Sequence, residues 1–547
     1  MILASLKKSL LPRIASAAEQ VGAQPPEKIE FQPAPAHVPA DLCLPWPLSA
    51  AKQARKPPME VAAAVCAALQ SLPEIEEAKA APPGFVNLRL RLSALAANVK
   101  AATLNPAAYG RDEGGGSRKI LIEFVSANPT GPLHLASGRG ATLGDALARI
   151  LRRLGRQVHC EYYVNDAGGR VELLGRSIQA RWDQNHGKNT EVPEKGYQGE
   201  YLKELAASAP AEAGGWTAEQ WGRFAMDALL ASHKEDMDAF GVKFDRWYLE
   251  SELYASKLVE QTLAFLKERG MVYEKESAVW LGTAEAEGST DDKDRVLVKS
   301  DGRPTYFLPD IAYHRDKFGR GFEELIDIWG ADHHGYVPRM RAAIAALGKP
   351  PESFKPIVHQ LIHLFRGKEA VKMSKRAGEF VRLKEVVDEV GRDACRFFFA
   401  LRTPDSHLAF DLELAKKQSA ENPVFYCQYV HARVCSIFRE AAKRGSPYED
   451  GIVNGALLSK PEERAILVKL AWFPEALRAC ERELSPHPLA NYLLETAGLF
   501  HPFYEKCRVV DPEEPALTQA RLLLCAGVRD IIREGLGLLG VCAPEEM

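Results

Sequence analysis

The chain has 547 residues, of which 46% are hydrophobic and 26% charged, with a net charge of -3. This length exceeds what one hydrophobic core normally organises and predicts about two to four domains. So small a net charge gives no general attraction to polyanions, so a nucleic-acid surface would have to be a local basic patch. The ten cysteines form no CxxC pair, which favours free thiols in a reducing compartment over a disulfide scaffold or zinc ribbon. No apolar run approaches a membrane span, and we expect a cytoplasmic protein without a membrane partner.

Residues 1–110 form an Ala- and Pro-rich zone that we expect to be a separate domain. Its opening, MILASLKKSLLPRIASAAEQ, is basic with no early acid, a pattern shared by organellar transit peptides. As a helix, however, it would gather four apolar residues on one side: Ile2, Leu6, Leu10 and Ile14. We therefore favour the first helix of a domain. A helical stretch at 59–72 and a strand-like GFVNLRLRL at 84–92 follow, before the Gly-rich loop GRDEGGGSR that predicts a boundary.

Residues 111–401 alternate strand and helix patterns, which is typical of a parallel α/β sheet. The polar, Gly-rich stretches at 183–199 and 209–215 indicate an insertion, which we place around residues 183–300. Residues 402–547 have an almost wholly helical pattern. The expected fold class is therefore α/β, with a Rossmann-like catalytic domain, an α+β N-terminal domain and an all-α C-terminal domain.

The clearest βαβ unit starts with the predicted strand KILIEFVSAN, continues with the helix ATLGDALARILRRLG and ends with the strand QVHCEYYV. The turn between the first strand and the helix is ANPTGPLHLAS, and Gly155 suits the left-handed cap that ends the helix. In open α/β sheets such a turn binds anionic ligands, because free N–H groups and the helix dipole both favour negative charge. Taken alone, His134 in this turn is better explained as a capping or packed histidine.

A second strand, turn and helix follow at LIDIWGADHHGYVPRMRAAIAALG, with Gly330, Asp332 and His333 in the turn. An Asp at a strand end can accept hydrogen bonds from ribose hydroxyls, and a glycine lets a base approach the backbone. Two adjacent histidines are too few for a metal site. His359 and His363 have the spacing of a zinc helix, but Gln360 replaces the base and the local pattern favours a strand, so we reject zinc there.

The third turn, GKEAVKMSKRAG, gathers four basic residues: Lys368, Lys372, Lys375 and Arg376. A charge run of this kind is usually a solvated surface. Beside a nucleotide fold, however, lysines can close over phosphates and stabilise the charge that develops as pyrophosphate leaves.

Together, PLHLAS and VKMSKR in an α/β domain resemble the HxGH and KMSKS motifs of class I aminoacyl-tRNA synthetases. Further stretches are similar to the bacterial form of the arginyl-tRNA synthetases, from about Lys119 to the C-terminus. They include EFVSANPTGPLH, EYYVNDAGG, IWGADHHGYVPRM, VKMSKRAGEFVRL and ENPVFYCQYVHARVCSI. The resemblance implies a tRNA-contacting domain over residues 1–110, catalysis within 111–401 and an anticodon-binding domain over 402–547.

The resemblance implies a reaction in which arginine and ATP form arginyl-adenylate and pyrophosphate, after which the arginyl group passes to tRNA and AMP is released. Members of this family need bound tRNA before they activate arginine. ATP would enter as its Mg2+ complex, without a tightly bound cofactor or protein-bound metal. His134, Lys372 and Lys375 are the implied catalytic residues. The implied ATP-binding residues are Asn128, Pro129, His134, Ser137, Gly330, Asp332, His333, Lys372, Met373, Ser374 and Lys375.

Arginine recognition should need acids, because only carboxylates match a guanidinium fork in a bidentate way. The family's arginine-binding positions fall on Glu123, Asn128, Tyr306 and Asp310. Glu123 lies in an apolar strand, where an unpaired charge would be unfavourable. The resemblance also makes Tyr429 and Met547 candidates for stacking on unpaired tRNA bases, although Tyr429 could equally be a core residue. We expect a monomer.

Two alternatives remain open at this stage. A small-molecule adenylyltransferase can share the fold, although the long helical C-terminal domain argues against it. A tRNA-binding paralogue with impaired catalysis is the second, because the motif here is HLAS, with Ala136 and Ser137 in place of glycine and histidine. We favour an active variant, since Ser137 keeps a hydroxyl donor and the helix N-terminus binds phosphate without either side chain.

Overall fold

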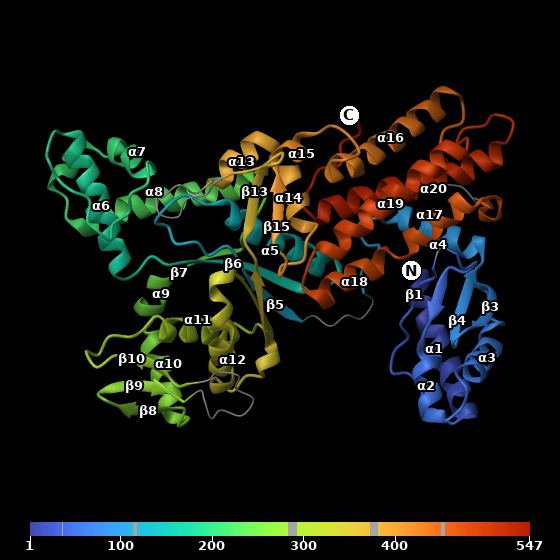
Figure 1. Ribbon diagram of the computed structural model, residues 1–547, viewed down its shortest axis with the longest axis horizontal. Coiled ribbons are helices and arrows are strands. Elements are labelled where there is room, and N and C mark those ends of the chain that lie inside the picture. Colours follow the sequence, from blue (N-terminus) through green and yellow to red (C-terminus); the bar gives the residue numbers. More distant parts are fainter. Residues whose placement is uncertain (36, 113–117, 283–292, 372–380, 450–453) are drawn as a thin grey trace.

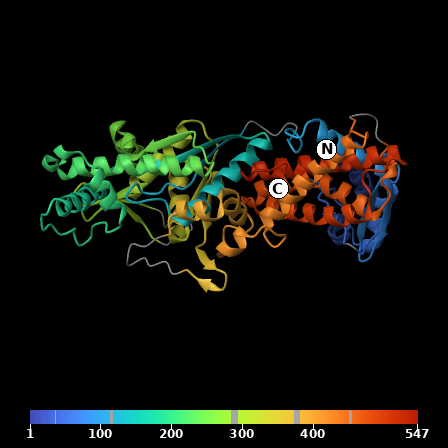
Figure 2. The ribbon, with the colours of Figure 1, turned by 90° about the horizontal axis from the view of Figure 1, so that it is seen from above.

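The computed structural model describes residues 1–547 except 36, 113–117, 283–292, 372–380 and 450–453. The molecule is elongated, with the N-terminal domain at one end and a helical subdomain at the other (Figure 1, Figure 2). None of the described helices combines the length and apolar character that a membrane crossing needs.

The N-terminal domain packs helices against an antiparallel sheet of order β1-β2-β4-β3. Its strands are β1 (Gln32–Pro33), β2 (Leu42–Leu44), β3 (Ile75–Ala81) and β4 (Phe85–Leu90). Its helices are α1 (Ile2–Val21), α2 (Trp46–Ala54), α3 (Pro58–Leu69) and α4 (Leu92–Leu104). The first helix buries the predicted apolar side, Ile2, Leu6, Leu10 and Ile14, which confirms the helix.

The central sheet has five parallel strands in the order β12-β11-β5-β6-β7. They are β5 (Lys119–Glu123), β6 (Gln157–Val164), β7 (Arg246–Leu249), β11 (Glu324–Gly330) and β12 (Phe354–His359). The chain builds outward from β5 through β6 to β7, then returns to the other side of β5 with β11 and β12. This order confirms the Rossmann-like α/β prediction and makes the space between β5 and β11 the switch point where such sheets bind ligands.

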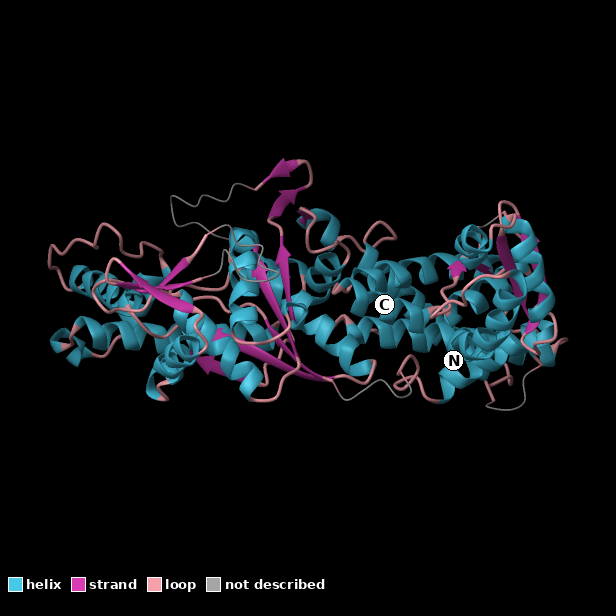
Figure 3. Ribbon diagram, turned by 90° about the horizontal axis from the view of Figure 1, so that it is seen from below, coloured by secondary structure: helices cyan, strands magenta, loops and turns pink. Residues whose placement is uncertain are grey.

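Helices cover both faces of this sheet (Figure 3). They include α5 (Leu135–Arg153), α11 (Phe307–Gly319) and α12 (Val337–Ala346), with 3-10 turns η2 (Ala331–Tyr336) and η3 (Pro351–Ser353). A close approach fixes α5: a Cβ on Gly144 would lie 2.2 Å from Cγ of Phe124. Gly155, with φ of +97°, follows the helix in the predicted left-handed conformation.

The predicted insertion around 183–300 is not one block, and this boundary needs correction. β7 lies inside that range, yet it pairs with β6 as the edge strand of the central sheet. Two separate excursions flank it. The first contains α6 (Gly169–Asn185), α7 (Tyr201–Ser208), η1 (Ala211–Gly215) and α8 (Ala218–Ala239). The second contains α9 (Glu250–Ala255), α10 (Leu258–Glu268), β8 (Val272–Lys275), β9 (Ala278–Leu281) and β10 (Arg295–Val298).

Beyond β12 the chain forms a small sheet and then the predicted helical domain. The small sheet has β13 (Ile362–Arg366), β14 (Glu369–Ala370) and β15 (Leu408–Asp411). Helices α13 (Leu383–Val390) and α14 (Arg392–Ala400) lie between β14 and β15, before the predicted domain begins. The helices within residues 402–547 are α15 (Leu412–Lys416), α16 (Pro423–Lys443), α17 (Pro461–Ala471), α18 (Phe473–Glu483), α19 (His487–Lys506) and α20 (Pro515–Leu538), with η4 (Gly455–Leu457).

The N-terminal domain is joined tightly to this helical domain. Helix α4 lies against α17 and α20, so close that a Cβ on Gly527 would lie 2.6 Å from Cγ1 of Val99. Nearby, the Arg464 guanidinium donates to both carboxylate oxygens of Asp41, at 2.9 and 2.6 Å. The two domains therefore share one packed interface.

Replacing Gly144 by alanine should destabilise the catalytic domain, because the new methyl group would overlap the Phe124 ring. Overpacking of this kind costs about 1–3 kcal/mol, more than the roughly 1 kcal/mol that alanine gains over glycine in a helix. The matched control is Gly498→Ala in α19, where the nearest atom would lie 3.9 Å away, and which should be neutral or stabilising. Urea unfolding midpoints test this, and equal midpoints for the two variants would contradict it.

Candidate functional site

The carboxyl ends of β5 and β11 bring two predicted turns together. Gly330 ends β11, and the 3-10 turn η2 carries Asp332 and His333 immediately beyond it. The Asp332 and His333 side chains are 82% and 52% exposed, and the Nδ1 of His333 lies 3.2 Å from a carboxylate oxygen of Asp332. These side chains are therefore accessible to a ligand at the switch point.

The turn between β5 and α5 contains strained backbone. Val125 and Ser126 have φ of +71° and +39°, a region that a β-branched residue such as valine strongly disfavours. Asn128 in this turn is half-buried and Pro129 is buried. Such strain persists only where the surroundings impose it, and it is frequent at functional sites.

His134 is the N-cap of α5: its Nδ1 accepts a hydrogen bond from the Ser137 N–H at 3.2 Å. The Ser137 hydroxyl lies 3.4 Å from the same nitrogen. The capping explanation weighed from sequence is thus correct for Nδ1, while the side chain stays exposed. Ser137 therefore supports the conformation of His134 at the helix N-terminus, and it does so from the position where the usual motif has histidine.

Lys372, Met373, Ser374 and Lys375 lie outside the described residues. The segment that follows them is placed firmly against the first turn: Leu135 N–H donates to Val381 O at 3.2 Å, and Leu383 N–H donates to Leu133 O at 2.9 Å. This short ladder, with the bridge between His134 and Arg382, brings residues 381–383 next to the N-terminus of α5.

The four predicted arginine-binding residues come from three elements. Glu123 ends β5, Asn128 lies in the turn, and Tyr306 and Asp310 lie at the start of α11. Asp310 accepts a hydrogen bond from the Tyr336 hydroxyl, and burial raises the pKa of its carboxyl. Tyr306 is 69% exposed. Burial raises the pKa of the Tyr163 phenol, and the nearby Glu250, Asp310 and Glu123 charges raise it further, so these acids belong to one region.

Glu123 is already paired with a lysine. The fully buried Nζ of Lys317, on α11, lies 2.6 Å from Oε2 of Glu123 and 3.0 Å from Oδ1 of Asp327. The other carboxylate oxygen of Glu123 accepts from the Ser126 hydroxyl at 2.9 Å. Burial disfavours the charged amine, but the Asp327 and Glu123 carboxylates outweigh it and raise the pKa of Lys317. Lys317 therefore stays charged.

Two acids near this ion pair have no lysine or arginine hydrogen-bonded to them among the described residues. Asp310 is one, and Glu250, at the start of α9, is the other. Burial and the neighbouring Asp310 charge raise the pKa of Glu250 to about 7, although the hydrogen bond with Tyr163 partly lowers it. Burial also raises the pKa of Tyr163, so its phenol remains protonated. A cationic side chain placed here would meet two carboxylates.

Tyr429 lies on α16 in a stacked aromatic group. Its ring centroid is 6.3 Å from those of both Phe425 and His501, with interplanar angles of 16° and 13°. The Arg433 guanidinium lies over Tyr429, 5.3 Å from its centroid. Tyr429 is half-buried, so it is neither a core residue nor fully solvated. Met547 is 56% exposed.

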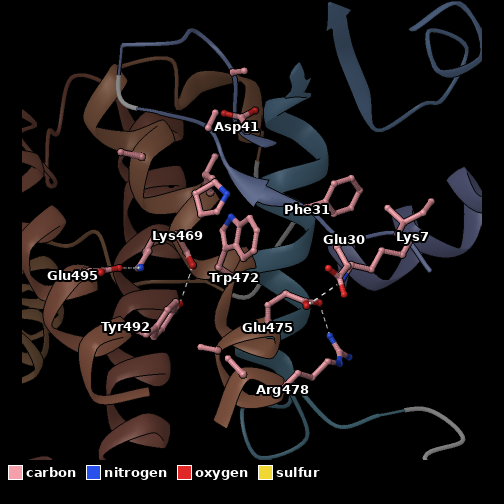
Figure 4. A pocket seen from close by; sticks show the side chains of 18 of the residues that line it. Lys7, Glu30, Phe31, Asp41, Lys469, Trp472, Glu475, Arg478, Tyr492 and Glu495 are labelled. Atoms are coloured by element: carbon pink, nitrogen blue, oxygen red, sulfur yellow. Dashed lines mark hydrogen bonds and ion pairs between the residues drawn. The ribbon is translucent and has the colours of Figure 1, made fainter. Parts of the chain in front are cut away.

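A cavity lies elsewhere, between two domains. It measures about 1230 Å3 and is lined by residues of the N-terminal domain and of helices α17, α18 and α19, beside the packed interface of the two domains (Figure 4). Trp472 and Tyr492 line it, together with two ion pairs, Lys7 with Glu475 and Lys469 with Glu495. We assign it no step in the chemistry, because it lies far from the ends of β5 and β11.

His359 and His363 lie on strands β12 and β13, as the local pattern predicted, and not on one helix face. Within the described parts of the chain, His, Cys, Asp and Glu nowhere gather in a group of three that could hold a metal ion.

Comparisons with known proteins agree with this architecture. Family models match three regions: "Arginyl tRNA synthetase N terminal domain" at 5–90, "tRNA synthetases class I (R), catalytic domain" at 98–399 and "DALR anticodon binding domain" at 427–547. The chain belongs to the arginyl-tRNA synthetase family. The "Arginine--tRNA ligase" of Elusimicrobium minutum is 50% identical over 546 residues, with 100% of both chains covered. That of Carboxydothermus hydrogenoformans is 45% identical, covering 91% of this chain and 90% of its relative.

A solved structure confirms the fold class. Arginyl-tRNA synthetase from Thermus thermophilus aligns with a TM-score of 0.79 and 25% identity, covering 99% of this chain and 100% of that one. Membership of the family, with its N-terminal and anticodon-binding domains, removes the small-molecule adenylyltransferase as an alternative.

Sequence reasoning missed Lys317, Glu250 and the role of Tyr163. Lys317 lies in the charged run HRDKFGR, which has the composition of a solvated surface. Glu250 begins a helix, where acids are common because they complement the helix dipole. Only Tyr163 had a sequence signal, since it lies in the motif EYYVNDAGG.

Lys317→Met should strongly destabilise the protein, because it leaves Glu123 and Asp327 buried without their shared cation. Breaking a buried ion pair from one side typically costs about 3–5 kcal/mol. The double variant Lys317→Met/Glu123→Gln, which also removes one of the stranded charges, should recover part of that loss. Thermal unfolding midpoints of the three proteins provide the test. A double variant no more stable than Lys317→Met would show that the charge on Glu123 is not the cause.

Proposed function

We propose that the chain ligates L-arginine to its cognate tRNA at the ends of β5 and β11. The arginine carboxylate attacks the α-phosphate of ATP, supplied as its magnesium complex, and pyrophosphate leaves. A hydroxyl of the terminal adenosine of tRNA then attacks the arginyl carbonyl, and AMP leaves. No protein nucleophile is needed, so the protein contributes positioning and charge stabilisation. The observation that carries this proposal is a pair of acids, the half-buried Asp310 and the buried Glu250, beside a strained turn at the switch point.

The side chain of arginine is proposed to bind between Asp310 and Glu250. Lys317 is paired with Glu123 and Asp327, whereas Asp310 and Glu250 have no such partner among the described residues and could face a guanidinium. Tyr163 contacts Glu250 and Tyr336 contacts Asp310, and both tyrosines would hold the acids in a fixed orientation. Glu123 and Asn128 then serve the α-amino and carboxylate end, at the mouth of the turn. A substrate without a guanidinium would leave the buried acids unpaired, which gives strong discrimination.

ATP is proposed to lie across the two turns. The positive end of the α5 helix dipole suits its phosphates, and the exposed His134 lies at the same end. Asp332 is placed to accept from ribose hydroxyls, and Gly330 leaves room for the base. Lys372 and Lys375 would act on the leaving pyrophosphate, since the segment that follows them is anchored beside His134.

The anticodon is proposed to bind at the aromatic group on α16 and α19. The Phe425, Tyr429 and His501 rings offer flat surfaces for unpaired bases, a common mode of single-stranded RNA recognition. The C-terminal tail contacts the same helix, because a ring nitrogen of His431 lies 2.8 Å from Pro544 O. Met547 follows Pro544 by three residues along the chain. Residues 1–110 complete the proposed tRNA surface, and we propose a monomeric, cytoplasmic enzyme.

The decisive experiment is arginine-dependent ATP–pyrophosphate exchange, run with and without tRNA. We expect exchange only with tRNA present, and a lower rate for His134→Ala, because its loss removes both the helix cap and a group beside the phosphates. Ser137→Ala should lower the rate as well, since the hydroxyl supports His134. Protein that binds ATP and tRNA yet shows no arginine-dependent exchange would contradict the proposal and leave a non-catalytic tRNA-binding paralogue.

The arginine KM should fall as pH rises through about 7. Below that value Glu250 is protonated, since its pKa is raised to about 7, and the pocket has one negative charge fewer for the guanidinium. Glu250→Gln should raise the KM at pH 8 and flatten this pH dependence. Asp310→Asn should also raise the arginine KM, because losing a hydrogen bond to a charged group weakens binding by about 1.5–3 kcal/mol. The ATP KM should stay nearly unchanged.

Steady-state exchange kinetics between pH 6 and pH 8.5 provide the measurement, with Glu260→Gln as the control. Glu260 is an acid on the adjacent helix α10 that makes none of these contacts. If Glu250→Gln kept the wild-type pH dependence of the arginine KM, Glu250 would have no place in the pocket.

A further inference from the structure

The helical subdomain α6–α8 touches the ATP-binding turn with two polar side chains. We propose that these, Tyr201 on α7 and His233 on α8, position the turn for catalysis without contacting substrate themselves. This inference rests on the proposed function, which assigns the turn to ATP. In Figure 1 the subdomain lies beside the sheet, with α8 running back towards the strand ends.

The turn has little structure of its own to hold its shape. Residues 124–134 form no helix or strand except the single bridge at His134. The bonds within the turn are short-range, such as Thr130 N–H to Asn128 O at 2.7 Å and Ser126 N–H to Phe124 O at 3.0 Å. With Val125 and Ser126 in the left-handed region, this conformation needs support from outside.

Three side chains give that support by taking up the carbonyls of the turn. The Tyr201 hydroxyl donates to Thr130 O at 2.5 Å, and Nε2 of His233 donates to Gly131 O at 2.7 Å. From β6, the Tyr162 hydroxyl lies 3.0 Å from Ala127 O and 3.0 Å from Nδ1 of His233, and it can donate its single proton to either of them. Each of these carbonyls lies within the segment that carries Asn128 and leads to His134.

His233 is held in one tautomer by these contacts. A carbonyl oxygen can only accept, so the Nε2 that faces Gly131 O carries the proton. Burial lowers the pKa of His233, and its side chain is fully buried, so the ring stays neutral and its unprotonated Nδ1 competes with Ala127 O for the single Tyr162 proton. The orientation of the ring, and with it the position of Gly131, is therefore fixed.

The subdomain is rigid enough to transmit this constraint. Helix α8 begins with a capping box formed by Thr217 and Gln220, and α6, α7 and α8 share a core around Trp182 and Trp221. The Tyr201 ring belongs to the same packed group and also covers Gly131, where a Cβ would lie 3.6 Å from the ring. A shift of this block relative to the sheet would move the turn, and His134 with it.

Tyr201→Phe tests the proposal, because it removes one hydroxyl and keeps the ring. In tRNA-dependent exchange, kcat/KM for ATP should fall about 3- to 10-fold, the usual effect of losing one hydrogen bond. The pH at which the arginine KM changes should stay at the wild-type value, because Glu250 and Asp310 lie on other elements. Tyr197→Phe is the matched control: it packs in the same subdomain without bonding to the turn, and should behave as wild type.

His233 gives an independent check through rescue. His233→Leu should lower kcat/KM for ATP, whereas His233→Gln, which retains an N–H donor, should recover part of the loss at a similar unfolding temperature. An active wild type with Tyr201→Phe indistinguishable from it, or with Tyr197→Phe equally impaired, would overturn the inference and leave the proposed function intact. An inactive wild type would instead count against the proposed function.

Discussion

The site depends on one buried ammonium group, that of Lys317. Glu123 and Asp327 are register partners in the parallel pairing of β5 with β11, so their carboxylates lie side by side where the sheet reverses its order. Like charges at opposed positions destabilise a sheet, and burial strengthens the repulsion. Lys317 bonds to both and lets the two strands stay paired. The carboxyl ends of β5 and β11 can therefore carry acidic side chains while the two strands remain paired.

The same helix links this pair to the proposed arginine pocket. Asp310, His314 and Lys317 occupy successive turns of one face of α11. His314 contacts Asp310 O at 2.7 Å through one ring nitrogen and Asp327 at 2.9 Å through the other. The helix thus carries the acid proposed to bind arginine and also directs His314 and Lys317 towards the carboxylates of the sheet. Rigid support of this kind is what charge-based recognition requires, since binding groups held in place lose little entropy when a ligand arrives.

The elements that place the site could be predicted from the sequence, because each has a local pattern. Strand β6 matches the predicted run QVHCEYYV residue for residue, and the turns before His134 and after Gly330 follow from the strand-to-helix sequence around them. β7 was missed because an edge strand of four residues carries no periodicity that distinguishes it from a loop. Lys317 and Glu250 were missed for another reason: their types match an exposed helix, and only tertiary packing buries them. The ligand roles given to Asn128, Asp332 and Met547 remain predictions.

The close approach of Val99 to Gly527 bears on how the protein can be divided. Three family models cover the chain in sequence, yet α4, which precedes the catalytic sheet, lies in the groove of the C-terminal bundle. Removing the first hundred residues would expose an apolar trench along α20 and leave Arg464 without Asp41. The C-terminal helices alone would therefore be prone to self-association. The two ends of the polypeptide therefore form one packed unit, and the catalytic domain lies between them in the sequence. This unit can assemble only after the C-terminal helices have been synthesised.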